Sequence, residues 1–90
     1  MAKATLNPPP GFITKLETAL HDRFAGADVR VEHIRDSRYR FSIVWDGFSG
    51  KGHPERQRRV WAVVESVVPH ESLLDIGMIL TLAPEELPQD

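Results

Sequence analysis

Apolar residues recur at helical spacing over residues 12–25 and at every second position in two segments that follow. The first pattern predicts a helix with one stripe facing a core. The apolar residues of this stripe are Phe12, Ile13, Leu16, Ala19, Leu20 and Phe24. The alternating segments, 28–34 and 39–46, predict two strands. Because Asp36 and Ser37 between them favour a turn, the two strands are expected to form an antiparallel hairpin.

A second helix is predicted over residues 54–68, although several valines there prefer strands. Pro54 suits the first helical position, where its missing N–H would be unpaired anyway. His53 then stands at the capping position, and Pro69 ends the helix. The length of the segment and this start signal favour a helix over a strand. One face of this helix would be formed by Val60, Val64, Val67 and Val68.

A third strand is predicted over residues 73–82, which are apolar at nearly every position. Such a strand is typically covered on both faces. Its one predicted face consists of Leu74, Ile76, Met78, Leu80 and Leu82. The order helix, strand, strand, helix, strand predicts an α+β domain of two layers, with a three-stranded mixed sheet and the helices on one face. We expect a flexible proline-rich lead at residues 1–11, a single domain at 12–87 and a tail at 88–90.

The composition narrows the classes of function. A chain of 90 residues forms one small domain with a modest core, and its formal net charge of −2 argues against a generally basic nucleic-acid binder. It has no cysteine, which excludes disulfides, thiol catalysis and a cluster held by its own thiolates. No apolar run approaches the ~20 residues of a membrane span. We therefore expect a soluble, cytoplasmic protein that binds no membrane. No arrangement of catalytic residues stands out, so we also expect that it is not an enzyme.

The cations are unevenly placed, since every Lys and Arg lies at or before Arg59. Lys51, Arg56, Arg58 and Arg59 surround the predicted start of the second helix, after a glycine-rich loop. Cations are mildly unfavourable at this positive end of a helix. Their presence indicates a surface that docks a phosphate, a nucleic-acid backbone or an acidic partner protein. The alternative is a solvated cationic face with Glu55 as the partner.

The central segment, residues 41–61, resembles the central block of BolA-like proteins and reads FSIVWDGFSGKGHPERQRRVW. That block has a strand, then Phe-x-Gly, then Arg-His-Arg leading a helix that carries an aromatic residue. Here these positions hold Phe48-Ser49-Gly50, Arg56-Gln57-Arg58 and Trp61. Near the end, Ala83-Pro84-Glu85-Glu86-Leu87 is similar to the family's Thr-Pro-Glu-Glu-Trp. The resemblance covers nearly everything from Ile13 onward and implies a fold similar to a class II KH domain.

The resemblance also implies a non-enzymatic adaptor or regulator. BolA-like proteins pair with monothiol glutaredoxins, share or trade a [2Fe–2S] cluster with them, and tune iron regulation. The cluster ligand is typically the histidine of Arg-His-Arg, helped by a His or Cys in the loop between the first two strands. Here Gln57 replaces that histidine, and the loop has neither residue. An amide is a poor iron ligand, so we expect a shared cluster to be bound more weakly.

The candidate partner- or anion-binding residues are Lys51, Arg56, Gln57, Arg58, Arg59 and Trp61. For a metal, the remaining candidate is His53, which lies four residues before Gln57; the alternative is a polar residue at the helix start. The first functional hypothesis is therefore an adaptor for a monothiol glutaredoxin. The second is a nucleic-acid-binding regulator that uses the basic patch 51–59 on phosphates.

Overall fold

Two helices and three strands make up the domain in the order that the sequence predicts. The computed structural model describes residues 11–87. These residues form α1 (Gly11–Arg23), β1 (Asp28–Arg35), β2 (Arg38–Val44), α2 (His53–Val67) and β3 (Ile76–Leu82). The same residues include three short 3-10 turns, η2 (Asp46–Phe48), η3 (His70–Asp75) and η4 (Pro84–Glu86). The predicted lead and tail lie outside the described residues, apart from Gly11, at which α1 begins.

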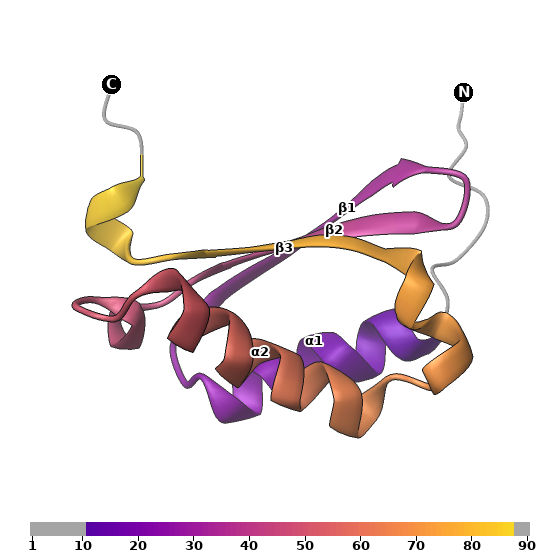
Figure 1. Cartoon of the computed structure of the whole chain (residues 1–90), viewed down its shortest axis with the longest axis horizontal. Coiled ribbons are helices and arrows are strands. Elements are labelled where there is room, and N and C mark those ends of the chain that lie inside the picture. The colour runs from indigo at the N-terminus through magenta and orange to yellow at the C-terminus, as the bar shows by residue number, and fades with distance from the viewer. Residues whose placement is uncertain (1–10, 88–90) are drawn as a thin grey trace.

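The sheet has β2 at its centre. β1 pairs with it antiparallel, as the hairpin prediction requires, and β3 pairs with it parallel. Figure 1 shows α1 and α2 on the same side of this sheet, so the predicted two-layer α+β architecture is confirmed. The other face of the sheet carries no helix among residues 11–87.

The core lies between the helices and the covered face of the sheet. The apolar stripe of α1 is buried there, and the valine-rich segment is helical because its buried face completes the same core. The most deeply buried large side chains are Leu16, Leu20, Phe41, Ile43, Phe48, Val60 and Val64. No helix in the described part of the chain is long and apolar enough to cross a membrane.

The alternation predicted for β3 is wrong. Tyr39 of β2 pairs with Ile76, but Arg40 pairs with Met78, so Gly77 is an extra residue in β3. One extra residue moves every later side chain to the opposite face. The prediction also began the strand too early, because residues 70–75 form η3.

The buried residues of β3 are consequently Ile79 and Thr81, which are 5% and 3% exposed. Met78 and Leu80, predicted to share a face with Ile76, are 49% and 38% exposed on the open face of the sheet, whereas Ile76 is buried. β3 is also an edge strand, covered on one face only. Its continuous apolar character therefore reflects exposed apolar side chains and not a central position.

This register gives a direct test by substitution. Ile79→Ala should lower the free energy of unfolding by about 2–4 kcal/mol, because it opens a cavity in the core. Leu80→Ala, its neighbour on the open face, should cost less than about 1 kcal/mol. Chemical denaturation of both variants measures the difference. Equal losses at the two positions would contradict the observed register.

Candidate partner-binding site at the start of α2

Glycines set the path of the loop from β2 to α2. A Cβ on Gly47 would lie 2.3 Å from the Trp45 ring, so only glycine lets the loop pass this side chain. Gly50 has a φ of +79°, a left-handed conformation that glycine adopts without steric cost. The N-cap of α2 is Gly52. His53 is thus the first helical residue and not the cap that the sequence predicts.

Arg56 is the centre of this region, and it is buried. Its side chain is 4% exposed and forms a bidentate ion pair with Glu86 of η4, with nitrogen–oxygen distances of 2.7 and 3.0 Å. The same guanidinium donates to the backbone carbonyls of Lys51, at 2.8 Å, and Thr81, at 3.1 Å. The prediction that Arg56 belongs to an exposed cationic surface is therefore wrong; it joins the loop, β3 and η4 internally.

Both members of this pair are held in their charged forms. The hydrogen bonds from Arg56 and from the Ala83 backbone N–H lower the pKa of Glu86 from 4.5 to about 2. The hydrogen bond to Glu86 raises the pKa of Arg56, although burial opposes this. Bidentate guanidinium–carboxylate bonds are among the stronger polar interactions in proteins. The pair therefore stays ionised at neutral pH and across mildly acidic conditions.

Gln57 is also engaged within the chain. Its amide nitrogen donates to the Ile79 carbonyl at 2.9 Å, and its amide oxygen accepts from the indole N–H of Trp61 at 3.1 Å. The prediction placed Gln57 and Trp61 on the docking surface. The structure shows both side chains half-buried, with their polar groups bonded to each other and to β3.

Arg56 and Gln57 together cover the edge of β3. The Leu82 carbonyl accepts from the Trp45 N–H and so faces β2. Because alternate residues of a parallel strand face the same neighbour, the carbonyls of Ile79 and Thr81 face away from β2. These are the two carbonyls that Gln57 and Arg56 occupy. Side chains that occupy an open strand edge protect it from pairing with another chain.

Sequence reasoning missed the two glutamates of η4 as site residues. Glu86 holds Arg56, and Glu85 accepts from the Ser49 hydroxyl at 2.8 and 3.0 Å, which attaches the loop to η4. Their only signal in the sequence was the similarity of the Pro84-Glu85-Glu86 segment to the family's ending. That similarity indicated the fold but gave no role for either carboxylate.

The cations near the start of α2 that are not buried form a smaller group, which we call the cationic surface: Lys51, Arg58 and Arg59. A terminal nitrogen of Arg59 lies 3.0 Å from a carboxylate oxygen of Glu55, one turn earlier on α2. This is the glutamate partner that the alternative prediction names. The ion pairs among residues 11–87 include neither Lys51 nor Arg58. Arg58 is exposed and Lys51 is half-buried. This surface therefore keeps positive charge available for a ligand or a partner.

The described residues do not fit an iron–sulfur cluster held by this chain. Thiolate or imidazole ligands are required, and both amide atoms of Gln57 are already hydrogen-bonded. His53 is the only imidazole on α2 and is exposed at its first residue. No group of three or more His, Cys, Asp or Glu side chains in residues 11–87 could hold a metal ion.

Comparison with known proteins identifies the fold. No family model matches the sequence, and no curated protein matches it either. BolA1 from Arabidopsis thaliana superposes with a TM-score of 0.72 and 18% identity, over 88% of this chain and 99% of that chain. For the BolA domain of SufE1 from the same plant, the TM-score is 0.66 with 17% identity, over 87% and 98% of the two chains.

A Bol-like protein from Babesia bovis is similar as well, with a TM-score of 0.54 and 18% identity over 93% of each chain. This chain therefore has the fold of BolA proteins along almost the whole length of those structures. The fold that the resemblance implied is confirmed.

The Arg56–Glu86 pair predicts how stability depends on pH. Because the pKa of Glu86 falls from 4.5 to about 2 on folding, its contribution is complete above about pH 4.5 and is lost as the pH falls toward 2. Glu86→Gln should lower the free energy of unfolding at pH 7 and flatten its decline between pH 4.5 and 2. Urea denaturation over this pH range measures both effects.

The matched control is Glu85→Gln, which removes the neighbouring carboxylate that holds Ser49. This variant should keep the steep decline of the parent protein in the same window. A Glu86→Gln variant whose stability followed the parent at every pH would contradict the role of the pair.

Proposed function

We propose that this protein is a non-enzymatic adaptor that binds an acidic surface of a partner protein, of the monothiol glutaredoxin type, through the cationic surface. The observation that carries the proposal is that a BolA-like fold has three cations near the start of α2 that are not buried, Lys51, Arg58 and Arg59. The BolA domain of SufE1 shows the same fold as one part of a larger protein, which suits a module that works through other proteins.

The electrostatics of the cationic surface support binding to acidic groups. Positive side chains in the first turns of a helix are opposed by its dipole, so a partner's carboxylates would relieve this repulsion. Complementary charge also accelerates the encounter between two proteins. The loop before α2 is held by Arg56 and Glu85, so little order has to be gained on binding.

Cluster chemistry has a smaller part in this proposal. Since Gln57 bonds β3 and Trp61, a [2Fe–2S] cluster in the complex would be held mainly by the partner. No step of the proposed binding passes through a cluster. The nucleic-acid alternative has less support, because Arg56, one of its four cations, is buried against Glu86 and the formal net charge of the chain is −2.

The cationic surface is tested by a titration with a monothiol glutaredoxin, both free of cluster and cluster-loaded. Arg58→Ala/Arg59→Ala should weaken binding about tenfold or more, because charged contacts contribute strongly to such interfaces. The control is Arg35→Ala/Arg38→Ala, which removes two exposed arginines at the hairpin end, opposite the start of α2 (Figure 1).

Isothermal calorimetry gives both affinities, and amide chemical shifts of the labelled protein locate the contact. Unchanged affinity in the α2 variant, or shifts confined to residues outside 51–61, would rule out this surface. Binding to an RNA or DNA oligonucleotide that falls steeply with salt, without glutaredoxin binding, would favour the second hypothesis instead.

Gln57 gives a separate prediction about the cluster. Gln57→His supplies the imidazole that the family motif has at this position and should strengthen a cluster-bridged complex with the glutaredoxin. Gln57→Ala is the control, since it removes the amide without adding a ligand. Visible absorption and circular dichroism of the cluster report the change. Spectra that are the same for the parent and Gln57→His would contradict the prediction.

A further inference from the structure

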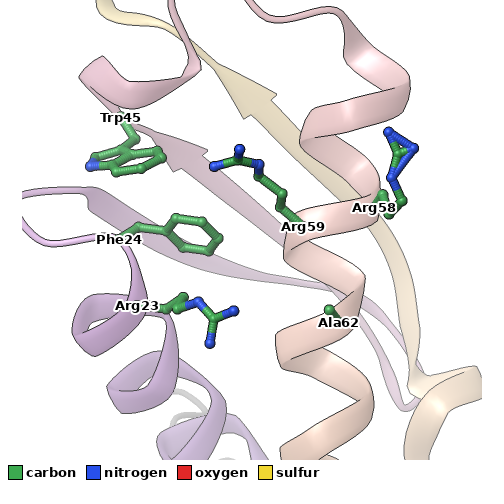
Figure 2. A pocket seen from close by; sticks show the side chains of 6 residues that line it. All are labelled: Arg23, Phe24, Trp45, Arg58, Arg59 and Ala62. Carbon is green, nitrogen blue, oxygen red and sulfur yellow. The ribbon is translucent and has the colours of Figure 1, made fainter.

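A pocket of about 350 Å³ lies between the end of α1, Trp45 directly after β2, and α2 (Figure 2). The residues that line it are Arg23, Phe24, Trp45, Arg58, Arg59 and Ala62. Three of the six are arginines and none is acidic. The volume falls within the usual range of small-molecule sites. The pocket is therefore large enough for an organic ligand and is positively charged.

Two of the arginines enter the pocket from opposite walls. Figure 2 shows the guanidinium of Arg23, from α1, and that of Arg59, from α2, directed into the same space, whereas Arg58 points away at the rim. No ion pair of Arg23 occurs among residues 11–87. Arg59 uses one terminal nitrogen on Glu55 and has other N–H groups left to donate. Two cations so placed repel each other unless an anion lies between them.

The remaining wall is apolar and fixed in place. The rings of Phe24 and Trp45 pack edge to face, with 4.9 Å between their centroids. The indole N–H of Trp45 donates to the Ala25 carbonyl at 3.0 Å, which leaves the hydrocarbon part of the ring toward Arg59 (Figure 2). Gly47 packs directly against this ring. The wall thus offers no hydrogen-bonding group and suits the carbon skeleton of a ligand.

We propose that this pocket binds the phosphate monoester of a small organic molecule. Two guanidinium groups supply more donors than the two oxygens of one carboxylate use, whereas a phosphate monoester has three terminal oxygens and a charge near −2. A water molecule occupies about 30 Å³, and a phosphate group is only a few times larger. A phosphate group alone therefore leaves most of the pocket empty. The apolar wall of Phe24, Trp45 and Ala62 accommodates the rest of the ligand. A 5′-mononucleotide has this chemistry and size.

The test adds adenosine monophosphate to the full-length ¹⁵N-labelled protein and follows its two indole N–H signals. The signal of Trp45, in the pocket wall, should shift in a saturable way, whereas that of Trp61, bonded to Gln57, should not. Trp61→Phe assigns the two signals. Adenosine, which lacks the phosphate, and inorganic phosphate, which lacks the organic part, should each bind at least about tenfold more weakly.

Substitutions identify the groups involved. Arg23→Gln should weaken binding about tenfold, with Arg35→Gln, an exposed arginine on β1, as the unchanged control. Glu55→Gln should strengthen binding, because it releases the terminal nitrogen of Arg59. Absence of a saturable Trp45 shift would overturn the proposal, as would equal affinity in Arg23→Gln. Equal affinity for adenosine would exclude the phosphate contact, and equal affinity for inorganic phosphate would exclude the organic part.

This inference is separable from the proposed adaptor function. Arg23 lies outside the cationic surface, so Arg23→Gln should bind the glutaredoxin as the parent does. Loss of the nucleotide with retained partner binding supports the pocket alone. Because Arg58 and Arg59 also line the pocket, loss of partner binding in Arg58→Ala/Arg59→Ala supports the adaptor function alone when Arg23→Gln and the parent show no saturable nucleotide binding.

Discussion

The ion pair between the buried Arg56 and the partly exposed Glu86 is the interaction on which the rest of this site depends. One guanidinium bonds the carboxylate of η4, the Thr81 carbonyl of β3 and the Lys51 carbonyl of the loop. Removing Glu86 would leave the Arg56 guanidinium, which is 4% exposed, without its counter-charge, and this is unfavourable, whereas the Glu86 carboxylate is 37% exposed and reaches water. Arg56 therefore attaches the start of α2, which also carries Arg58 and Arg59, to the edge of the sheet.

The pair also explains why an arginine stands at the positive end of a helix. The mild repulsion from the helix dipole is offset by a bidentate carboxylate 30 residues further along the chain. The unfavourable interaction of Arg56 with the helix dipole is therefore compensated within the protein and does not indicate an external ligand at this residue. At Arg58 no carboxylate of the described residues gives such compensation. An arginine without internal compensation at the positive end of α2 is therefore found at Arg58 but not at Arg56.

The sequence was sufficient for the order of elements, because the period of apolar residues distinguishes helix from strand and Gly and Pro mark the turns. It was insufficient where one residue changes the register. An isolated glycine inside a strand signals a bulge, and Gly77 is such a glycine, but the apolar residues on both sides hid the reversal. The Arg56–Glu86 pairing was hidden for another reason: charge and spacing do not reveal which of several glutamates reaches a given arginine.

Helical periodicity divides the first turns of α2 into two sides with different roles. Arg56 and Gln57 face β3 and close its edge, whereas Arg59 and Ala62, three positions apart, face the pocket beside α1. Gln57, at the position that holds a histidine in the BolA-like motif, lies on the first side, and its amide is already hydrogen-bonded to Ile79 and Trp61. The two proposed sites therefore share Arg59, which belongs to both the cationic surface and the pocket.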